Sequence, residues 1–444
     1  MKRIFFFVFL IFAVSGLFAQ NISLEQVRSL ALANSRSLAK LNLSLRSSAL
    51  DEKSQLFTML PSLSADYSAS VSYLDSEWHF VNPVDTFDAR ANFSITQKIF
   101  EGGKSFVQKA INEISSESTR KSALAEYFNV LDSADSAYYA VLEAAATLEA
   151  AEAALGRTVS NMSIAEIRQA GGMINPGDYL KALADKESQE NSRNQARRTL
   201  ALNTTKLKVL IGADINPYPE QIDLSVYEEI IQYLGNISDE DAASLYGRFW
   251  HIIAASNPSL ASAALNSQRA GKSLSLVKRD TSPVISATLF SGSVGYSTAK
   301  GFYNSSGGGV TLRGTIPLDF WVLSNRIEKS KIAVSSAALD YADRETQLET
   351  ELQSALINIF TQAESVLSSR RSLEYAQKHY EYVEERYRLS QSSVADLGDA
   401  SSLLITNRNN SIKANFGFLQ SLSKLRSLGA IDDEQRLVSV LRGS

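Results

Sequence analysis

The feature that most constrains this chain is an internal duplication. Four short segments of the first half recur 217 to 222 residues later: Leu38-Ala39 as Leu260-Ala261, Pro61-Ser62-Leu63-Ser64 as Pro283-Val284-Ile285-Ser286, Asp178 with Ala182 as Asp396 with Ala400, and Leu210-Ile211-Gly212 as Ser427-Leu428-Gly429. A nearly constant separation indicates two tandem copies of one structural unit. We therefore expect a first repeat over residues 21–212, a connector over 213–241, a second repeat over 242–429 and a C-terminal tail over 430–444.

In each repeat, the spacing of apolar residues changes from a helical to a strand-like pattern at a proline. A helical pattern stops at Pro61 in the first repeat and at Pro283 in the second. Beyond each proline, apolar and polar residues alternate one by one, which is typical of a strand with one apolar face. The alternation predicts paired strands at about 62–74 and 87–97 in the first repeat, and at about 284–291 and 309–316 in the second.

The predicted strands have the length and the single apolar face of strands that cross a bilayer in a barrel. A soluble antiparallel sandwich alternates in the same way and stays open as an alternative. An N-terminal export segment, described next, favours the barrel. Four strands cannot close a barrel around a pore, so several chains would have to share one.

Residues 1–20 have the pattern of a signal peptide. Lys2 and Arg3 precede an unbroken apolar run from Ile4 to Val14, and we expect cleavage near Ala19. This run is too short to span a bilayer, and no later run of 18 apolar residues follows, so the sequence predicts no transmembrane helix. The chain has no cysteine, so packing has to hold the exported fold together without disulfides.

Each repeat also contains a very long helical segment. No proline stands between Pro83 and Pro176, which predicts one helix over residues 104–170. At about 1.5 Å per residue, such a helix is on the order of 100 Å long. The second repeat has the same pattern over residues 325–391, with a seven-residue stripe typical of a coiled-coil seam: Leu352, Ile359, Val366, Leu373, Tyr380 and Tyr387.

The long helices are predicted to reverse at turns over residues 171–177 and 392–395. Return helices then run to about Gly212 and Gly429, where glycine suits a C-terminal cap. A plain antiparallel coiled-coil hairpin fits the seam locally, but it does not account for the paired strands.

The sequence offers no constellation for catalysis or for a cofactor. A net charge of −4 without a basic block argues against a nucleic-acid partner. The three histidines are scattered without metal-ligand spacing. Gly103-Lys104-Ser105 resembles the end of a phosphate-binding loop, but Lys98 stands where that loop needs glycine. We therefore expect no enzyme, no cofactor and no metal site.

The order and spacing of several short motifs resemble the TolC-like outer-membrane efflux protein family over nearly the whole mature chain. The motifs are Ser23-Leu24-Glu25-Gln26, Leu60-Pro61-Ser62-Leu63, Ile99-Phe100-Glu101-Gly102-Gly103, Ile316-Pro317-Leu318-Asp319, Gly177-Asp178-Tyr179-Leu180 and Asp396-Leu397-Gly398-Asp399-Ala400. The resemblance implies a mainly α fold with a β-barrel part, assembled as a homotrimer. Three chains of four strands would give a barrel of 12 strands, and a tunnel of twelve helices would extend into the periplasm.

The resemblance also implies a function. A member of this family would sit in outer-membrane lipid and export small molecules or polypeptides, as the exit duct of a tripartite efflux or type I secretion system. Its partners would be a periplasmic adaptor protein and an inner-membrane transporter. The alternative is an exported coiled-coil structural or adhesive surface protein, which would not conduct ions.

The resemblance further implies a gate at the periplasmic entrance. The family's tip acids fall on Asp178, Asp396 and Asp399, and its tyrosine falls on Tyr387. The family's arginine falls on Ser392, which is a departure. Arg386 and Arg388 stand nearby in the sequence as candidate replacements.

Two interpretations of the tip acids stay open. Asp396 and Asp399 are three residues apart and therefore share one helix face, so six carboxylates from three chains would form a ring that attracts cations. Alternatively, Asp396 pairs with Ser393 in a capping box, and Asp178 serves the same end after Asn175. Tyr387 also continues the heptad stripe, so it has a packing interpretation.

Overall fold

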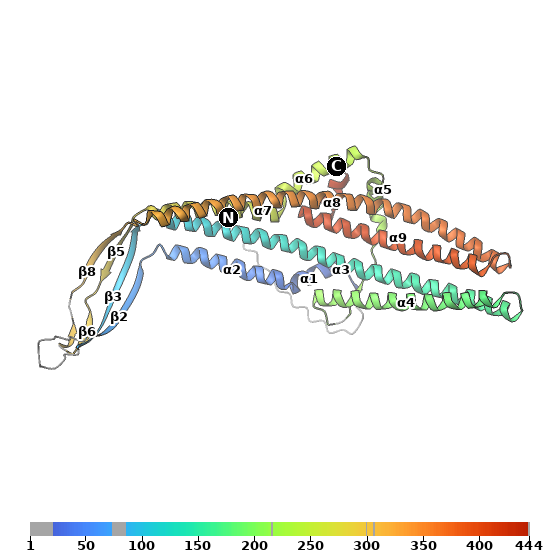
Figure 1. Cartoon of the computed structure of the whole chain (residues 1–444), viewed down its shortest axis with the longest axis horizontal. Coiled ribbons are helices and arrows are strands. Elements are labelled where there is room, and N and C mark those ends of the chain that lie inside the picture. The colour runs from blue at the N-terminus through green and yellow to red at the C-terminus, as the bar shows by residue number, and fades with distance from the viewer. Residues whose placement is uncertain (1–20, 73–85, 215, 299, 305–306, 443–444) are drawn as a thin grey trace. The chain divides into compact units, whose positions relative to one another are not determined.

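A computed structural model of the protein describes residues 21–72, 86–214, 216–298, 300–304 and 307–442 (Figure 1). The predicted signal peptide, with cleavage near Ala19, lies outside the described residues. The chain divides into two compact units. We call residues 37–126 with 256–350 the sheet unit, and residues 1–36 with 127–255 and 351–444 the tip unit; each is described by itself.

The first repeat contributes the longest strand pair of the sheet unit. Strand β2 (Ser62–Ser72) runs antiparallel to β3 (Thr86–Phe100), with Ser62 opposite Thr96 and Ser72 opposite Thr86. The register places Leu63 opposite Ile95 on one face. On the other face the hydroxyls of Ser64 and Ser94 lie 2.7 Å apart. The alternation predicted from sequence is thus an apolar face and a polar face, because successive side chains point to opposite sides of a strand.

The second repeat differs from the prediction of two short strands. Strands β5 (Val284–Phe290) and β6 (Val294–Ser297) pair in succession with the same edge of β3. Strands β7 (Gly301–Asn304) and β8 (Gly309–Thr315) then pair with β6 and β5. The second repeat therefore provides two long strands, each interrupted once. The predicted strands at about 284–291 and 309–316 are present as β5 and β8, but β6 and β7, with four residues each, are too short to show a period in the sequence.

The sheet exposes much of its apolar side-chain surface. Leu63 and Tyr67 on β2 are each 75% exposed, and Leu312 on β8 is 69% exposed. No helix among the described residues is long and apolar enough to cross a membrane. In the sheet order, β2 and β8 each have one strand partner within the described chain.

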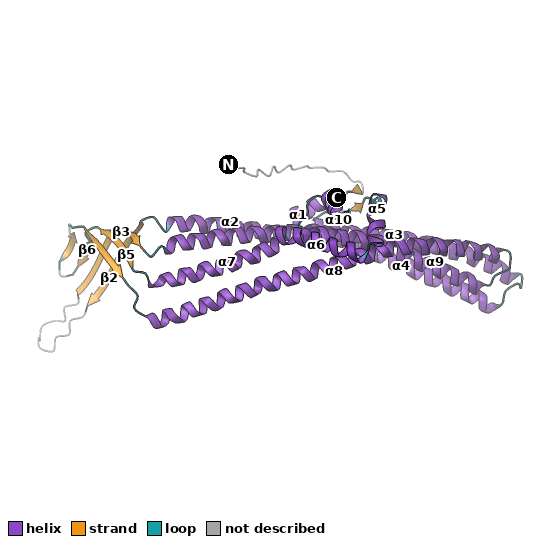
Figure 2. Ribbon diagram, turned by 90° about the horizontal axis from the view of Figure 1, so that it is seen from above, coloured by secondary structure: helices purple, strands orange, loops and turns teal. Residues whose placement is uncertain are grey.

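Helices make up the rest of the fold (Figure 2). In the first repeat these are α1 (Leu24–Asn34), α2 (Arg36–Phe57), α3 (Lys104–Ala170) and α4 (Pro176–Ile211); in the second they are α6 (Asp239–Ser256), α7 (Pro258–Lys278), α8 (Phe320–Arg388) and α9 (Val394–Gly429). The predicted long helices are therefore present as α3, with 67 residues, and α8, with 69 residues.

The connector and the tail are more structured than the sequence indicated. The connector holds a strand, β4 (Tyr218–Pro219), which pairs with β1 (Asn21–Ile22), and a helix, α5 (Glu228–Gly235). The tail forms α10 (Glu434–Arg442). One of the two predicted glycine caps is present. Gly212 caps α4 in the left-handed conformation, whereas the left-handed cap of α9 is Ala430, which follows Gly429.

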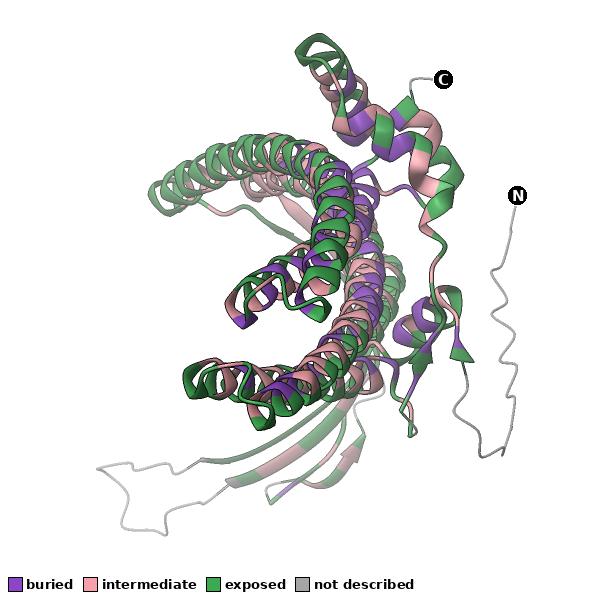
Figure 3. Cartoon of the chain, turned by 90° about the vertical axis from the view of Figure 1, so that its right-hand side faces the viewer, coloured by how far each residue is buried: buried purple, intermediate pink, exposed green. Residues whose placement is uncertain are grey.

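The heptad stripe on α8 is a buried seam. Figure 3 shows that buried and exposed residues alternate along the long helices. Leu352, Ile359 and Val366 have no exposed surface, Tyr380 and Tyr387 are almost fully buried, and Leu373 is partly buried. Near the helix ends of the tip unit, the stripe packs with residues of α3, α4 and α9 into one apolar cluster. This cluster fixes the position of the turns that follow.

A buried ionic cluster ties three distant segments of the tip unit together. The Asp135 carboxylate on α3 has no exposed surface. Arg28 of α1 donates to both of its oxygens, at 2.7 and 2.9 Å. Arg426 of α9 donates at 2.9 Å and the Ser423 hydroxyl at 2.8 Å. Burial opposes the charge on Arg28, but the hydrogen bond and the charge of Asp135 outweigh it and raise the pKa of Arg28.

Candidate functional site at the helical tips

The two long helices, α3 and α8, end in two separate turns of the same type. After α3, Gly172 is left-handed with φ +69°, and the Met173 amide donates to the Arg168 carbonyl at 2.8 Å. After α8, Ser390 is left-handed with φ +61°, and the Gln391 amide donates to the Arg386 carbonyl at 2.8 Å. Both have the hydrogen bond of a Schellman motif. Equivalent residues of the two tips are 218 positions apart, as Asp178 and Asp396 are.

The left-handed residue is glycine in the first turn and serine in the second, so exchanging these residue types tests the cost of the left-handed conformation. A left-handed residue other than glycine carries a steric cost of about 1 kcal/mol or more. We expect Ser390→Gly to stabilise the tip by roughly 1 kcal/mol, and Gly172→Ser to destabilise it by a similar amount. Denaturation midpoints of the purified variants measure both effects. Equal midpoints for the two variants would contradict the assignment.

Each turn is followed by a capped helix whose third residue is a predicted gate acid. Asn175 caps α4: its side chain accepts from the Asp178 amide and donates to the Asp178 carboxylate, both at 2.8 Å. Ser393 caps α9: its hydroxyl accepts from the Asp396 amide at 3.1 Å, and its amide donates to the Asp396 carboxylate at 3.0 Å. The capping interpretation is therefore present at both acids.

The surroundings of Asp396 stabilise its negative charge. The Ser393 amide is the main cause that lowers the pKa of this carboxyl, and the hydroxyls of Ser393 and Ser392 add to it. Donors that stabilise the charged form keep it ionised at neutral pH. Asp399 lies on α9 with an exposed side chain. Asp396 therefore caps α9 while its side chain stays exposed to solvent, and Asp399 is exposed as well.

The predicted tyrosine lies beside an arginine that the sequence did not single out. Tyr387 is 1% exposed, and the guanidinium carbon of Arg168 lies 4.3 Å from its ring centroid. Arg168 Nη2 also donates to the backbone carbonyls of Tyr387 and, at 3.3 Å, of Arg388. A buried cation thus stacks on the ring and satisfies carbonyls at the C-terminal end of α8. Burial raises the pKa of Tyr387, against the opposing charge of Arg168.

Arg386 and Arg388, the candidate replacements for the family's arginine, have other partners. Arg386 donates to the Gln391 carbonyl at 3.0 Å and lies over the Tyr382 ring at 5.7 Å. Arg388 pairs with Glu384 at 2.9 Å. Neither candidate is the arginine stacked on Tyr387. Arg168 was missed because it comes from the first repeat, 219 residues before Tyr387. The signal that could have found it is its place four residues before Gly172, where the second tip has Arg386.

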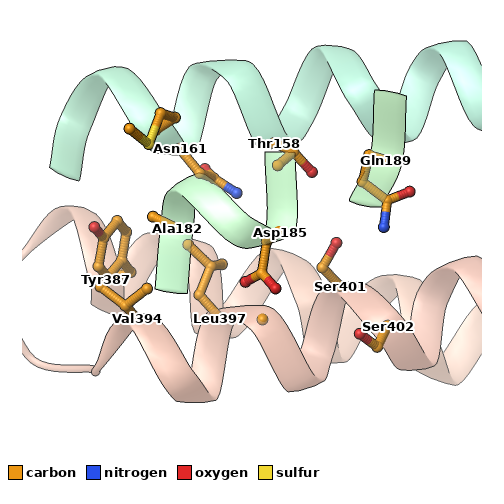
Figure 4. A pocket seen from close by; sticks show the side chains of 12 residues that line it. Thr158, Asn161, Ala182, Asp185, Gln189, Tyr387, Val394, Leu397, Ser401 and Ser402 are labelled. Carbon is orange, nitrogen blue, oxygen red and sulfur yellow. The ribbon is translucent and has the colours of Figure 1, made fainter. Parts of the chain in front are cut away.

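A small cavity lies between α3, α4, α8 and α9 behind the turns (Figure 4). The Asp185 carboxylate of α4 points toward α9, where a Cβ on Gly398 would lie 3.3 Å from it. Burial, and then the charge of Asp399, raise the pKa of Asp185, while Lys181 lowers it. Among the described residues, no three His, Asp or Glu side chains gather as a possible metal site. The residues around the turns contribute an apolar cluster and the charge of Asp396.

Comparisons with known proteins identify the family of the chain. The family described as outer membrane efflux protein matches residues 27–213 and 251–429. No curated protein matches the sequence. The fold is similar to that of several solved outer-membrane channels. The Campylobacter jejuni CmeC outer membrane channel has a TM-score of 0.79 at 15% identity, covering 94% of this chain and 88% of that one.

Two further structures show the same likeness. The Vibrio cholerae outer membrane protein VceC has a TM-score of 0.74 at 16% identity, covering 91% of this chain and 96% of that one. The open state of the Neisseria gonorrhoeae MtrE outer membrane channel has a TM-score of 0.71 at 15% identity, covering 94% and 93%. These identities are low, so the structural likeness concerns the fold.

Proposed function

Because the chain belongs to the outer membrane efflux protein family, we propose that it is the trimeric exit duct of a tripartite export system. Its family and fold make it an outer-membrane channel protein with a periplasmic helical part, and not an enzyme. An inner-membrane transporter would supply the energy and a periplasmic adaptor would couple it. The cargo class would be small molecules or polypeptides.

The observation that carries the proposal is the sheet with exposed apolar side chains and two edge strands. Backbone groups at an open sheet edge cannot face lipid, because no water is present to satisfy them. Strands β2 and β8 each pair with one strand of the described chain. We infer that both edges pair with neighbouring copies. Three copies of the four long strands would close a barrel of about 12 strands.

We propose that the turns that follow α3 and α8 form the entrance. Asp178, Tyr387, Asp396 and Asp399 would carry the gate, with Asp396 and Asp399 of three chains lining its axis. Support comes from the exposed side chains of Asp396 and Asp399 and from the lowered pKa of Asp396. An adhesive surface protein, the alternative from sequence, has no need of such an acid ring.

The acid ring is tested in planar bilayers. We expect Asp396→Asn with Asp399→Asn to weaken block by a trivalent cation at least about tenfold, because six charges leave the axis. A matched control is Asp239→Asn with Glu240→Gln, which removes the same charge from exposed acids at the start of α6. Unchanged block in the tip variant would refute the ring. A protein that forms no channel at all would refute the duct.

A further inference from the structure

One face of the sheet carries hydroxyl and charged side chains, and we call it the polar face. Directly opposite residues of antiparallel strands share a face. The register therefore places Ser64, Thr96 and Thr288 on the side of the sheet away from Leu63. The hydroxyls of Thr96 and Thr288 lie 3.1 Å apart. In the proposed barrel the apolar face contacts lipid, so the polar face would line the lumen.

Three side chains of the polar face form a row across three neighbouring strands. Lys98 of β3 lies directly opposite Ser286 of β5, and Ser286 lies directly opposite Arg313 of β8. Adjacent strands are about 4.8 Å apart, so the backbones of the two basic residues stand about 10 Å apart with the serine midway. Lysine and arginine have long side chains, which can meet above the serine between them.

The three residues of the row have donors to spare. Arg313 is exposed, and neither its guanidinium nor the Ser286 hydroxyl bonds to another side chain among the described residues. Lys98 Nζ lies 3.4 Å from Glu101 Oε2, and the lysine side chain is 56% exposed. A direct charge-assisted hydrogen bond is shorter, at about 2.7–2.9 Å. Two basic residues stand against one acid, so the row keeps a net positive charge.

The other charges of the polar face lie away from this row. Asp88 and Arg90 pair with each other at 3.2 Å. Asp66 lies opposite Asn92, six positions before Lys98 on β3, which is about 20 Å along the strand. Neither acid is therefore within hydrogen-bond reach of the row, and the positive charge of the row is left for a ligand.

We infer that Lys98, Ser286 and Arg313 form an oxyanion-binding site, which binds the carboxylate, sulfonate or phosphate group of an exported organic anion. The guanidinium can donate two parallel hydrogen bonds to such a group. The ammonium adds a compact charge and the serine a hydroxyl donor. This inference rests on the proposed duct and deepens it by naming an anionic class of cargo.

Each chain holds a complete site, because all three residues belong to one sheet. A trimer would carry three sites at the same level of the barrel. Rings of lysine or arginine side chains are a means by which pores favour anions. The site would therefore act on cargo inside the barrel, whereas the acids of the turns would act at the entrance.

Fluorescence anisotropy of pyrenetetrasulfonate, an organic anion with sulfonate groups, tests the site in the purified full-length protein in a neutral detergent. Lys98→Gln with Arg313→Gln should weaken binding of this dye at least about tenfold, because its charge-assisted hydrogen bonds are lost. A matched control is Lys40→Gln with Arg46→Gln, which removes the same charge from exposed side chains of α2. At a fixed ionic strength the control should change the dye affinity less than about twofold.

Glu101→Gln should have an effect of opposite sign. Glutamine keeps an oxygen for the Ser105 amide, which donates to Glu101 at 3.0 Å, but it removes the charge beside Lys98. We expect tighter binding of the dye, by about threefold. Weaker binding in this variant would overturn the part assigned to Lys98.

The outcomes separate the site from the duct. If the Lys98 and Arg313 variant binds the dye no more weakly than the α2 control, the site is overturned and the duct stands. A protein that binds the dye through these residues but forms no channel in planar bilayers overturns the duct alone. In protein that forms channels, block by the same dye should weaken at least about tenfold in the double variant. Block that persists there would overturn the role of the site in transport.

Discussion

Replacement of Arg168 with methionine is expected to raise the open probability of the proposed channel about thirtyfold. The variant keeps most of the side-chain volume but removes the stack on Tyr387 and the hydrogen bonds to two α8 carbonyls. A cation–π contact contributes about 0.5–2 kcal/mol, and a hydrogen bond from a charged donor about 1.5–3 kcal/mol. A net loss of about 2 kcal/mol shifts an equilibrium by about thirtyfold.

Single-channel recording in planar bilayers measures this open probability. Arg168→Lys should fall between the native protein and the methionine variant, because lysine keeps the charge without the planar fork. Arg388→Met is the matched control. Its arginine is exposed and pairs with Glu384, a surface pair worth about 0–1 kcal/mol. If Arg168→Met lowers stability yet leaves the open probability at the native value, Arg168 is a packing residue and has no part in the gate.

The second large effect concerns the buried ionic cluster. We expect Asp135→Ala to destabilise the tip unit by roughly 3–5 kcal/mol, because two buried arginines lose their common counter-charge. Arg28 and Arg426 come from α1 and α9, so both segments should loosen. Hydrogen exchange of the α1 amides and the denaturation midpoint of the purified protein measure the loss.

Asp132→Asn serves as the control for Asp135→Ala. Asp132 lies one turn earlier on α3, is only partly buried, and has Lys424 no closer than 3.9 Å. Its replacement should cost less than about 1 kcal/mol. Equal losses of stability in the two variants would mean that the contacts of Asp135 stabilise the protein no more than those of Asp132.

Much of the fold follows from local sequence patterns. The alternation after Pro61 predicted the β2–β3 pair, and the absence of proline predicted α3 and α8. The seven-residue stripe identified the buried seam that includes Tyr387. These predictions succeed because strand and helix periods act over neighbouring residues.

What the sequence missed depends on residues far apart in the chain. Arg28 meets Asp135 107 positions away, and Arg426 meets it 291 positions away. No local period marks such a cluster, and charged residues are by default expected on the surface. Arg168 was missed for the same reason. In the second repeat the predicted strands at about 284–291 and 309–316 are present as β5 and β8, whereas β6 and β7 were missed because each has only four residues and contains glycine.

The near-equal lengths of α3 and α8 have a consequence for how this chain can change. From Ile99 to Arg168 and from Ile316 to Arg386, the two repeats stay in register to within one residue, whereas earlier landmarks are displaced by 222. One inserted residue would rotate every later side chain by about 100° and advance it by about 1.5 Å. Between residues 127 and 167 that would carry Arg168 away from Tyr387. We therefore expect the chain to tolerate insertions and deletions in the strand connections and not within the long helices.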